Sequence, residues 1–187
     1  MKKILTILIA CLLACTVLVT FTACGQQEEP RVNSIGLAYE LNDEETGYIV
    51  IGKGTCGDKK VVIPETYKNK PVVAIGEKAF YNDLNLTGVD IPDSVLEIGS
   101  EAFRGCMGLK SVSLGSGVKS IGFRAFSSCD RLESIVIPIS VETMEDCIFT
   151  DSAVLKHIYY EGADKPSSWD GNWYYRCSAI IHYNYGK

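Results

Sequence analysis

The sequence predicts a solenoid of the α/β class, in which short parallel strands and short helical turns repeat every 23 residues. Three observations predict it. Apolar residues recur at this spacing through the middle of the chain, as in the column Val72, Val95, Val118 and Val141. Each repeat contains a short alternating run that is typical of a strand. Both ends of the chain depart from the period, as the terminal units of stacked arrays do.

Several further columns keep the same register through three or four copies. They are Ile75, Ile98, Ile121 and Met144; Ala79, Ala102 and Ala125; Phe80, Phe103, Phe126 and Phe149; Leu86, Leu109, Leu132 and Leu155; Val89, Val112, Ile135 and Ile158; and Ile91, Leu114, Ile137 and Tyr160. No single unit can bury its apolar edge alone, so we expect stacked units to share one continuous core.

The first segment of a unit has the pattern of a strand. In Leu86-x-x-Val89-x-Ile91 the last two apolar residues alternate, which places them on one face. Pro92 follows and ends the strand, because proline has no N–H to donate to the ladder. We expect neighbouring units to pair these strands in parallel, about 4.8 Å apart.

The second segment of a unit is shorter. Val95-x-x-Ile98 is expected to form another extended or turning stretch. Gly99 follows, and we expect it to permit a backbone angle that a side chain would resist. The pair Ala102-Phe103 is expected to lie on one short helical turn, with the phenyl ring in the interior of the coil.

The complete unit, V-x-x-I-G-x-x-A-F-x-x-C-x-x-L-x-x-V-x-I-P, resembles the BspA-like leucine-rich repeat of the Treponema-type class. The resemblance covers about residues 60–162. It implies a right-handed parallel solenoid of the kind carried by surface proteins of commensal or pathogenic bacteria and of some protists. By kinship alone, it also implies adhesion to host matrix proteins or to other bacteria.

The flanks of the repeats have the pattern of caps. Residues 36–52 predict a hairpin that turns between Asn42 and Gly47, and the first solenoid strand is expected over 61–63. After Tyr160 the chain becomes rich in aromatic residues and is expected to close with a strand over 180–183. The sequence thus predicts an N-terminal hairpin cap over 34–59, leucine-rich repeats over 60–162 and a C-terminal cap over 163–187.

Residues 1–23 have the pattern of a lipoprotein signal peptide. Lys2 and Lys3 precede an uncharged run over 4–23, after which the chain turns polar. The segment that ends in Ala23-Cys24 resembles a bacterial lipobox, which implies cleavage before Cys24 and a two-chain glyceride on it. Two acyl chains make anchoring stable. Residues 24–33 would then form a lipidated cysteine and a polar tether that hold the domain at the outer face of a membrane.

Two alternatives to cleavage at Cys24 remain. Phe21 stands where the lipobox prefers leucine, and the segment before Cys15 matches the motif better. Cleavage at Cys15, however, would leave an apolar tail on the mature protein. An uncleaved segment of this length could also span a bilayer as an anchor.

The net charge argues against a nucleic-acid partner. The formal charge of the chain is −5, and removal of residues 1–23 with Lys2 and Lys3 lowers it by two to −7. Proteins that bind nucleic acid normally need a basic face that displaces counterions from phosphate. The acidic balance is compatible with a protein partner, with a glycan and with a membrane contact made through the lipid anchor.

The cysteines indicate a structural ladder. One column holds Asp83, Cys106, Cys129 and Ser152. All four side chains can form hydrogen bonds with the backbone of a turn, which is the usual role of this column in leucine-rich repeats. Cys147 falls in an outward column instead. Its pairing with Cys177 in the C-terminal cap is an alternative to two free thiols.

Signatures of catalysis are weak. Gly52-x-Gly54-x-x-Gly57 formally fits a dinucleotide-binding motif, but a strand is expected after it, and without a helix N-terminus nothing would hold a pyrophosphate. His157 and His182 are the two histidines of the chain, and a surface position is the default expectation for His157. No metal-ligand spacing is present. We expect neither a cofactor nor a metal site, and we expect that the protein is not an enzyme.

The outward rows of the predicted sheet are the expected partner-binding surface. They contain Asp90, Ser111, Ser113, Ser134, Val136, His157 and Tyr159. Most of these side chains are small, so the face is smooth and suits an extended partner better than a deep pocket would. An idle, solvated sheet is the alternative.

The sequence therefore predicts a cell-surface lipoprotein that binds host matrix or another bacterial surface protein through its repeat sheet. The alternative is a carbohydrate-binding accessory lipoprotein that stacks sugar rings on Trp169, Trp173 and Tyr174 of the C-terminal cap. Aromatic residues at this density also bury one another, which is the competing interpretation. An enzyme or an inhibitor of host proteins is a third and weaker possibility.

Overall fold

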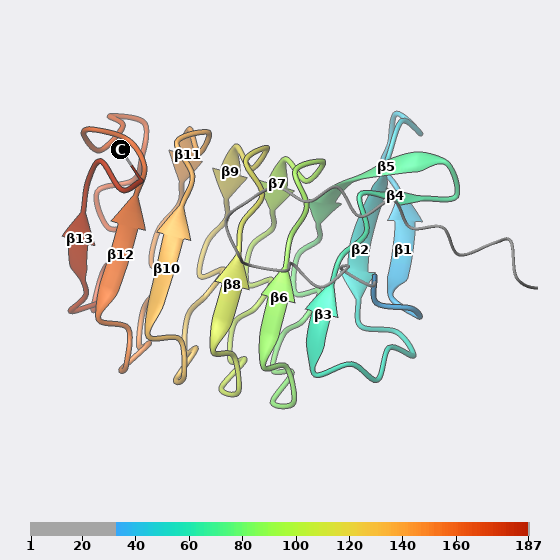
Figure 1. Ribbon diagram of the computed structural model, residues 1–187, viewed down its shortest axis with the longest axis horizontal. Coiled ribbons are helices and arrows are strands. Elements are labelled where there is room, and N and C mark those ends of the chain that lie inside the picture. The colour runs from blue at the N-terminus through green and yellow to red at the C-terminus, as the bar shows by residue number, and fades with distance from the viewer. Residues whose placement is uncertain (1–32, 187) are drawn as a thin grey trace, which may run out of the picture. The chain divides into compact units, whose positions relative to one another are not determined.

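The described part of the chain winds into coils that stack in sequence order. The computed structural model describes residues 33–186. The signal peptide, Cys24 and the tether expected over 1–32 lie outside the described residues. Figure 1 shows the coils following one another from the blue N-terminal hairpin to the red C-terminal strand. The fold is the predicted parallel solenoid with a period of about 23 residues.

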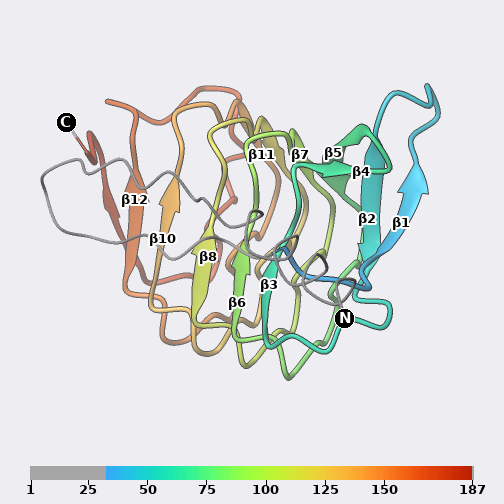
Figure 2. The same ribbon diagram turned by 45° about the vertical axis from the view of Figure 1, so that its right-hand side comes forward.

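One face of the solenoid carries the predicted repeat strands. They are β3 (Lys60–Val62), β6 (Gly88–Asp90), β8 (Ser111–Ser113), β10 (Ser134–Ile137), β12 (His157–Tyr160) and β13 (Ile180–His182). Strands β3, β6 and β8 form one parallel ladder, and β10, β12 and β13 form another. The two ladders follow one another along the same face, with β10 beside β8 (Figures 1 and 2).

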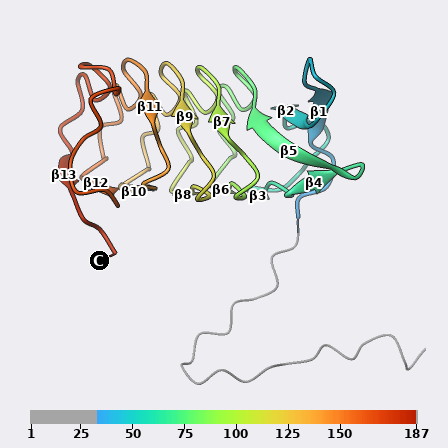
Figure 3. The same ribbon diagram turned by 90° about the horizontal axis from the view of Figure 1, so that it is seen from above.

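A second sheet is built from the shorter extended segments. It runs through β1 (Ala38–Leu41), β2 (Tyr48–Gly52), β5 (Lys70–Ile75), β7 (Glu97–Ile98), β9 (Ser120–Ile121) and β11 (Thr143–Met144), and β4 (Thr66–Tyr67) pairs with β5. Strands β1 and β2 are the predicted antiparallel hairpin, and β2 joins the solenoid by pairing in parallel with β5. Seen from above, the two sheets lie on opposite sides of the coils, with the interior between them (Figure 3).

A column of phenylalanine rings fills this interior, as the sequence predicts. Phe80, Phe103, Phe126 and Phe149 are at most 2% exposed. Their rings stack from coil to coil, with centroids 5.2, 5.2 and 6.0 Å apart and planes within 14° of parallel. This separation follows from the spacing of the backbones, since each ring sits at the same position of its own coil. The phenyl column therefore repeats the strand spacing inside the core.

The expected helical turns occur as single hydrogen-bonded turns. The Ala102 N–H donates to the Gly99 carbonyl, and the same bond recurs between Ala125 and Gly122, both at 3.2 Å. Residues 33–186 form no helix, and that part of the chain therefore has no helix that is long and apolar enough to cross a membrane. The turns pair with neighbouring coils instead. The Phe103 N–H donates to the Ala125 carbonyl of the next coil at 2.9 Å.

The repeated glycines have a different role from the one expected. Gly99 and Gly122 do not adopt a left-handed conformation; a Cβ at Gly122 would lie 2.7 Å from the Ser100 amide nitrogen of the preceding coil. A side chain is thus excluded by close packing of two backbones and not by the backbone angle. The left-handed residues come two positions later and carry side chains. They are Lys78, Glu101, Arg124 and Cys147, with φ between 53° and 60°.

The fourth copy replaces this glycine with Glu145, and the structure accounts for the exception. The Glu145 carboxylate accepts a hydrogen bond of 2.6 Å from the Phe123 N–H of the preceding coil. The side chain at this position thus satisfies a backbone donor of the neighbouring coil. The break in the repeat therefore marks the approach to the C-terminal cap and does not interrupt the stack.

We expect truncation inside the phenyl column to destabilise the whole stack. Phe103→Ala and Phe126→Ala should each lower the free energy of unfolding by about 3–5 kcal/mol, because each leaves a cavity between two rings. Urea denaturation followed by circular dichroism would measure the loss. Leu96→Ala is the control, since Leu96 is 48% exposed and its truncation should cost about 0.5 kcal/mol or less. Equal effects at Phe103 and Leu96 would contradict the shared core.

Candidate functional site

The outward face of the first sheet holds the residues predicted to meet a partner. Within each ladder the strands pair in the predicted register, with Asp90 opposite Ser113 and Ser134 opposite His157. The serines of the face, Ser111, Ser113 and Ser134, are exposed, while Asp90, Val136, His157 and Tyr159 are partly exposed. Gly88, in the same row as Ser111, is buried. The face is therefore smooth across its middle and gains larger side chains toward its ends.

The N-terminal end of this face is acidic. Asp90 forms an ion pair of 2.9 Å with Lys60, and the Asp93 carboxylate accepts a 2.7 Å hydrogen bond from the Ser116 N–H of the next coil. With Glu65, these carboxylates line a hollow of about 690 Å³ at the edge of the sheet. A single lysine offsets part of this charge, so this end of the face favours a cationic group.

The C-terminal end of the face carries a cluster of histidine and tyrosine that the sequence analysis did not recognise. His157 Nδ1 lies 3.0 Å from His182 Nε2. The Tyr159 ring stacks on His182 with centroids 4.7 Å apart and planes 19° apart, and Tyr185 lies 4.6 Å from Tyr159. The strand expected over 180–183 could have indicated this cluster, because parallel pairing of that strand with β12 places His182 beside Tyr159.

The aromatic residues of the C-terminal cap are mostly internal. Trp169 and Trp173 are 3% and 0% exposed, and their rings meet edge to face at 5.3 Å. Trp169 Nε1 donates to the Val141 carbonyl at 3.2 Å, and Trp173 closes the phenyl column against Phe149. Protein therefore covers the faces of both tryptophans, which contradicts the alternative that they stack on sugars and agrees with the competing interpretation that the aromatic residues of the cap bury one another. Tyr174, 43% exposed, is the remaining member of that set.

The cysteine column forms the ladder that the sequence predicts. Cys106 Sγ contacts the Phe80 carbonyl at 3.0 Å, Cys129 Sγ contacts the Phe103 carbonyl at 3.4 Å, and Ser152 Oγ donates to the Phe126 carbonyl at 3.0 Å. Burial raises the pKa of the Cys106 thiol to about 12 and that of Cys129 well above its usual value. These thiols stay protonated and serve as hydrogen-bond donors between coils.

Cys147 and Cys177 are both partly exposed, and no disulfide joins them. Cys147 occupies the left-handed column, with φ of 60°, and its N–H donates to the Asn172 carbonyl of the cap at 3.1 Å. The backbone of Cys147, and not its sulfur, links the last repeat to the cap.

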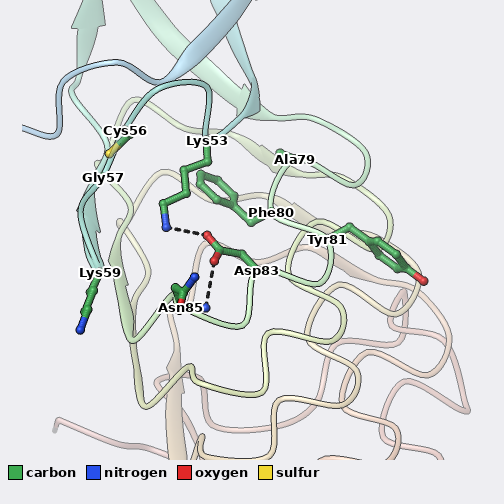
Figure 4. A pocket seen from close by; sticks show the side chains of 9 residues that line it. All are labelled: Lys53, Cys56, Gly57, Lys59, Ala79, Phe80, Tyr81, Asp83 and Asn85. Carbon is green, nitrogen blue, oxygen red and sulfur yellow. Dashed lines mark hydrogen bonds and ion pairs between the residues drawn. The ribbon is translucent and has the colours of Figure 1, made fainter.

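A shallow hollow lies where the hairpin cap meets the first coil (Figure 4). Its central feature is an ion pair between Lys53 Nζ and Asp83 Oδ2 at 2.8 Å, while Asp83 Oδ1 accepts a 3.0 Å hydrogen bond from the Asn85 N–H. Gly54 is left-handed, and the chain continues into β3 and not into a helix. The glycine-rich segment is thus a turn, and Lys53 ties it to the first coil.

The arrangement defines a leucine-rich-repeat scaffold that presents a sheet face. Among residues 33–186, no three His, Cys, Asp or Glu side chains converge as metal ligands. A family model for the BspA type leucine rich repeat region matches residues 73–186 in six copies. The chain belongs to this BspA-type leucine-rich-repeat family, whose repeat proteins are in general binding modules without catalytic activity.

Solved structures agree with this assignment. A leucine-rich repeat protein from Bacteroides capillosus is 38% identical over 70% of this chain and 98% of its own, with a TM-score of 0.62. The leucine rich repeat protein of T. pallidum is 28% identical, with a TM-score of 0.63 over 79% of this chain and 62% of its own. The present chain thus spans less than two thirds of the T. pallidum chain.

A leucine rich cell surface protein from Faecalibacterium prausnitzii shares the fold, with 23% identity and a TM-score of 0.51 over 85% of this chain and 56% of its own. No protein of curated function matches the chain.

The two classes of cysteine should differ in reactivity. We expect iodoacetamide at pH 8 to modify Cys147 well before Cys106 and Cys129 in the folded protein, because only the thiolate is nucleophilic and the ladder thiols are buried and protonated. Peptide mass spectrometry of timed samples would follow each site, with urea-unfolded protein as the control that labels all sites. Equal rates in the folded protein would contradict the ladder.

Proposed function

We propose that the protein is a cell-surface binding module that captures a protein partner, from host matrix or from another bacterial surface, on the outward face of β6, β8, β10 and β12. The observation that carries the proposal is that this face presents Ser111, Ser113 and Ser134 to solvent, on strands that keep parallel register within each ladder. Such a face lets an extended partner lie across several coils. Membership of a family of binding modules supports the same reading.

The distribution of charge supports a protein partner in particular. The face has an acidic N-terminal end around Asp90 and Asp93 and an aromatic C-terminal end around Tyr159. A polypeptide can match both ends, because it carries cationic and aromatic side chains on one chain. Electrostatic and aromatic contacts at separate points fix the register of such a partner.

Anchoring at the cell surface is the second part of the proposal. The lipobox-like segment that ends at Cys24 and the charged start at Lys2 and Lys3 support export and lipidation. The F. prausnitzii protein of the same fold is described as a cell surface protein. Cys24 would hold the solenoid at the outer face of the membrane, where a partner outside the cell can reach the sheet.

Substitutions on the face should weaken capture of the partner. Ser111→Arg and Ser134→Arg each add a long side chain at an exposed strand position, and each should reduce retention on a solubilised extracellular-matrix preparation or on bacterial cells by about tenfold or more. Thr143→Arg is the matched control, because Thr143 is exposed on β11 of the other sheet. Binding that Thr143→Arg impairs as strongly as Ser134→Arg would overturn the choice of face.

Removal of the anchor should release the protein. In cells that export the full chain, Cys24→Ala should block processing or move the protein from the membrane to the soluble fraction, because the substitution removes the thiol that would carry the lipid. Fractionation with immunoblotting would detect the change, and Cys15→Ala serves as the control that should leave anchoring intact. Normal maturation with unchanged membrane retention in Cys24→Ala would refute the proposal.

A further inference from the structure

The two histidines of the chain lie side by side, although 25 positions separate them in the sequence. His157 is in β12 and His182 is in β13, and the parallel register places Tyr159 opposite His182. The histidines are therefore diagonal neighbours on the same outward face. Nitrogen Nδ1 of His157 and nitrogen Nε2 of His182 face each other at 3.0 Å.

The surrounding aromatic rings hold this geometry. The Tyr159 ring stacks on that of His182 at 4.7 Å and lies 5.8 Å from that of His157, and the Tyr185 ring lies 4.6 Å from that of Tyr159. Both histidines are partly buried. Packing of this kind removes rotamer freedom before any ligand binds, so a ligand that needs both rings loses little further entropy.

We propose that His157 Nδ1 and His182 Nε2 form a binding site for a divalent transition metal ion such as Ni²⁺ or Zn²⁺. Two imidazole nitrogens at about 2.0–2.1 Å from one metal ion lie about 2.9 Å apart at a right angle and about 3.4 Å apart at a tetrahedral angle. The observed 3.0 Å falls within this interval. The separation of the two nitrogens therefore already matches a chelate. Rotation of the two rings about their side-chain bonds would turn both lone pairs from each other toward one ion.

The proton balance of the site is simple. In the metal-free protein, one of the facing nitrogens donates its hydrogen to the other, so one ring holds its proton at the interface. On binding, that ring changes tautomer: the facing nitrogen gives up its proton to water and the far nitrogen takes one up, so that both facing lone pairs coordinate the ion. Each neutral imidazole retains one N–H, and water fills the remaining positions. Neutral nitrogen donors select Ni²⁺, Cu²⁺ or Zn²⁺ over Mg²⁺ and Ca²⁺.

This site is independent of the proposed capture of a protein partner. It needs only the β12–β13 register and the two rings, and it would persist if the sheet face bound no protein. The spacing of 25 residues departs from the 23-residue period, and for that reason the sequence pattern alone gives no metal-ligand motif. The C-terminal cap creates the site by placing a histidine beside the last repeat.

The test uses the mature chain from residue 24 with Cys24→Ala, no affinity tag, and a reductant that does not bind metal. We expect isothermal titration with Ni²⁺ and with Zn²⁺ to show one site per chain. His157→Gln and His182→Gln should each weaken binding by about 10²-fold, because each converts a chelate into a single-imidazole contact. A rise in melting temperature with added Zn²⁺ should disappear in both variants.

A count-matched control separates chelation from nonspecific binding by histidine. The double variant His182→Gln with Thr143→His keeps two histidines per chain but places them on different sheets. It should bind as weakly as His182→Gln. Wild-type affinity in this double variant, or in either single variant, would overturn the proposal.

A measurement on the unaltered chain covers the case in which a variant misfolds. Substoichiometric Ni²⁺ should broaden the NMR signals of both histidine rings together, because one paramagnetic ion contacts both. Broadening of one ring alone, or of neither, would overturn the proposal. Mg²⁺ at the same concentration is the control and should leave both sets of signals unchanged.

Discussion

The stacking of each coil on the next is the constraint on which the rest of the structure depends. The coil-to-coil contact is made by the strand ladders, by backbone hydrogen bonds such as Phe103 N–H to Ala125 carbonyl, and by the phenyl column at 5.2–6.0 Å. No coil could bury its ring or satisfy its amides without a neighbour. The close approach of backbones at Gly122 follows from the same requirement, and so do the inward thiols of Cys106 and Cys129.

This constraint explains what the sequence could predict. The columns of apolar residues report which side chains face inward, so the strands, the phenyl column and the cysteine ladder follow from periodicity alone. Periodicity does not report backbone angles. The glycine at position 99 recurs in the repeat because there is no room for a side chain, and not because its φ is positive. The left-handed conformation occurs two residues later, at Glu101. A pattern of residue types cannot distinguish these two reasons for a glycine.

The features that the sequence could not predict lie where the period ends. The C-terminal cap has no second copy to define its columns, so the burial of Trp169 and Trp173 and the approach of His182 to His157 depend on a register that only the fold supplies. The expected strand over 180–183 was correct in place, but its alignment with β12 determines which side chains meet. One residue of slip would send His182 to the opposite face of the sheet.

The same reasoning locates selectivity at the two ends of the sheet face. Across its middle, Ser111 and Ser134 stand at equivalent positions of successive coils, so a partner that contacted only these serines could shift by one coil. Register can be fixed only by groups that do not repeat. Asp90 with its Lys60 partner marks one end, and the cluster of His157, Tyr159, His182 and Tyr185 marks the other. Discrimination between partners depends on contacts that a shifted or foreign ligand cannot reproduce. The caps therefore do more than close the core, because they supply the aperiodic chemistry that a periodic face lacks.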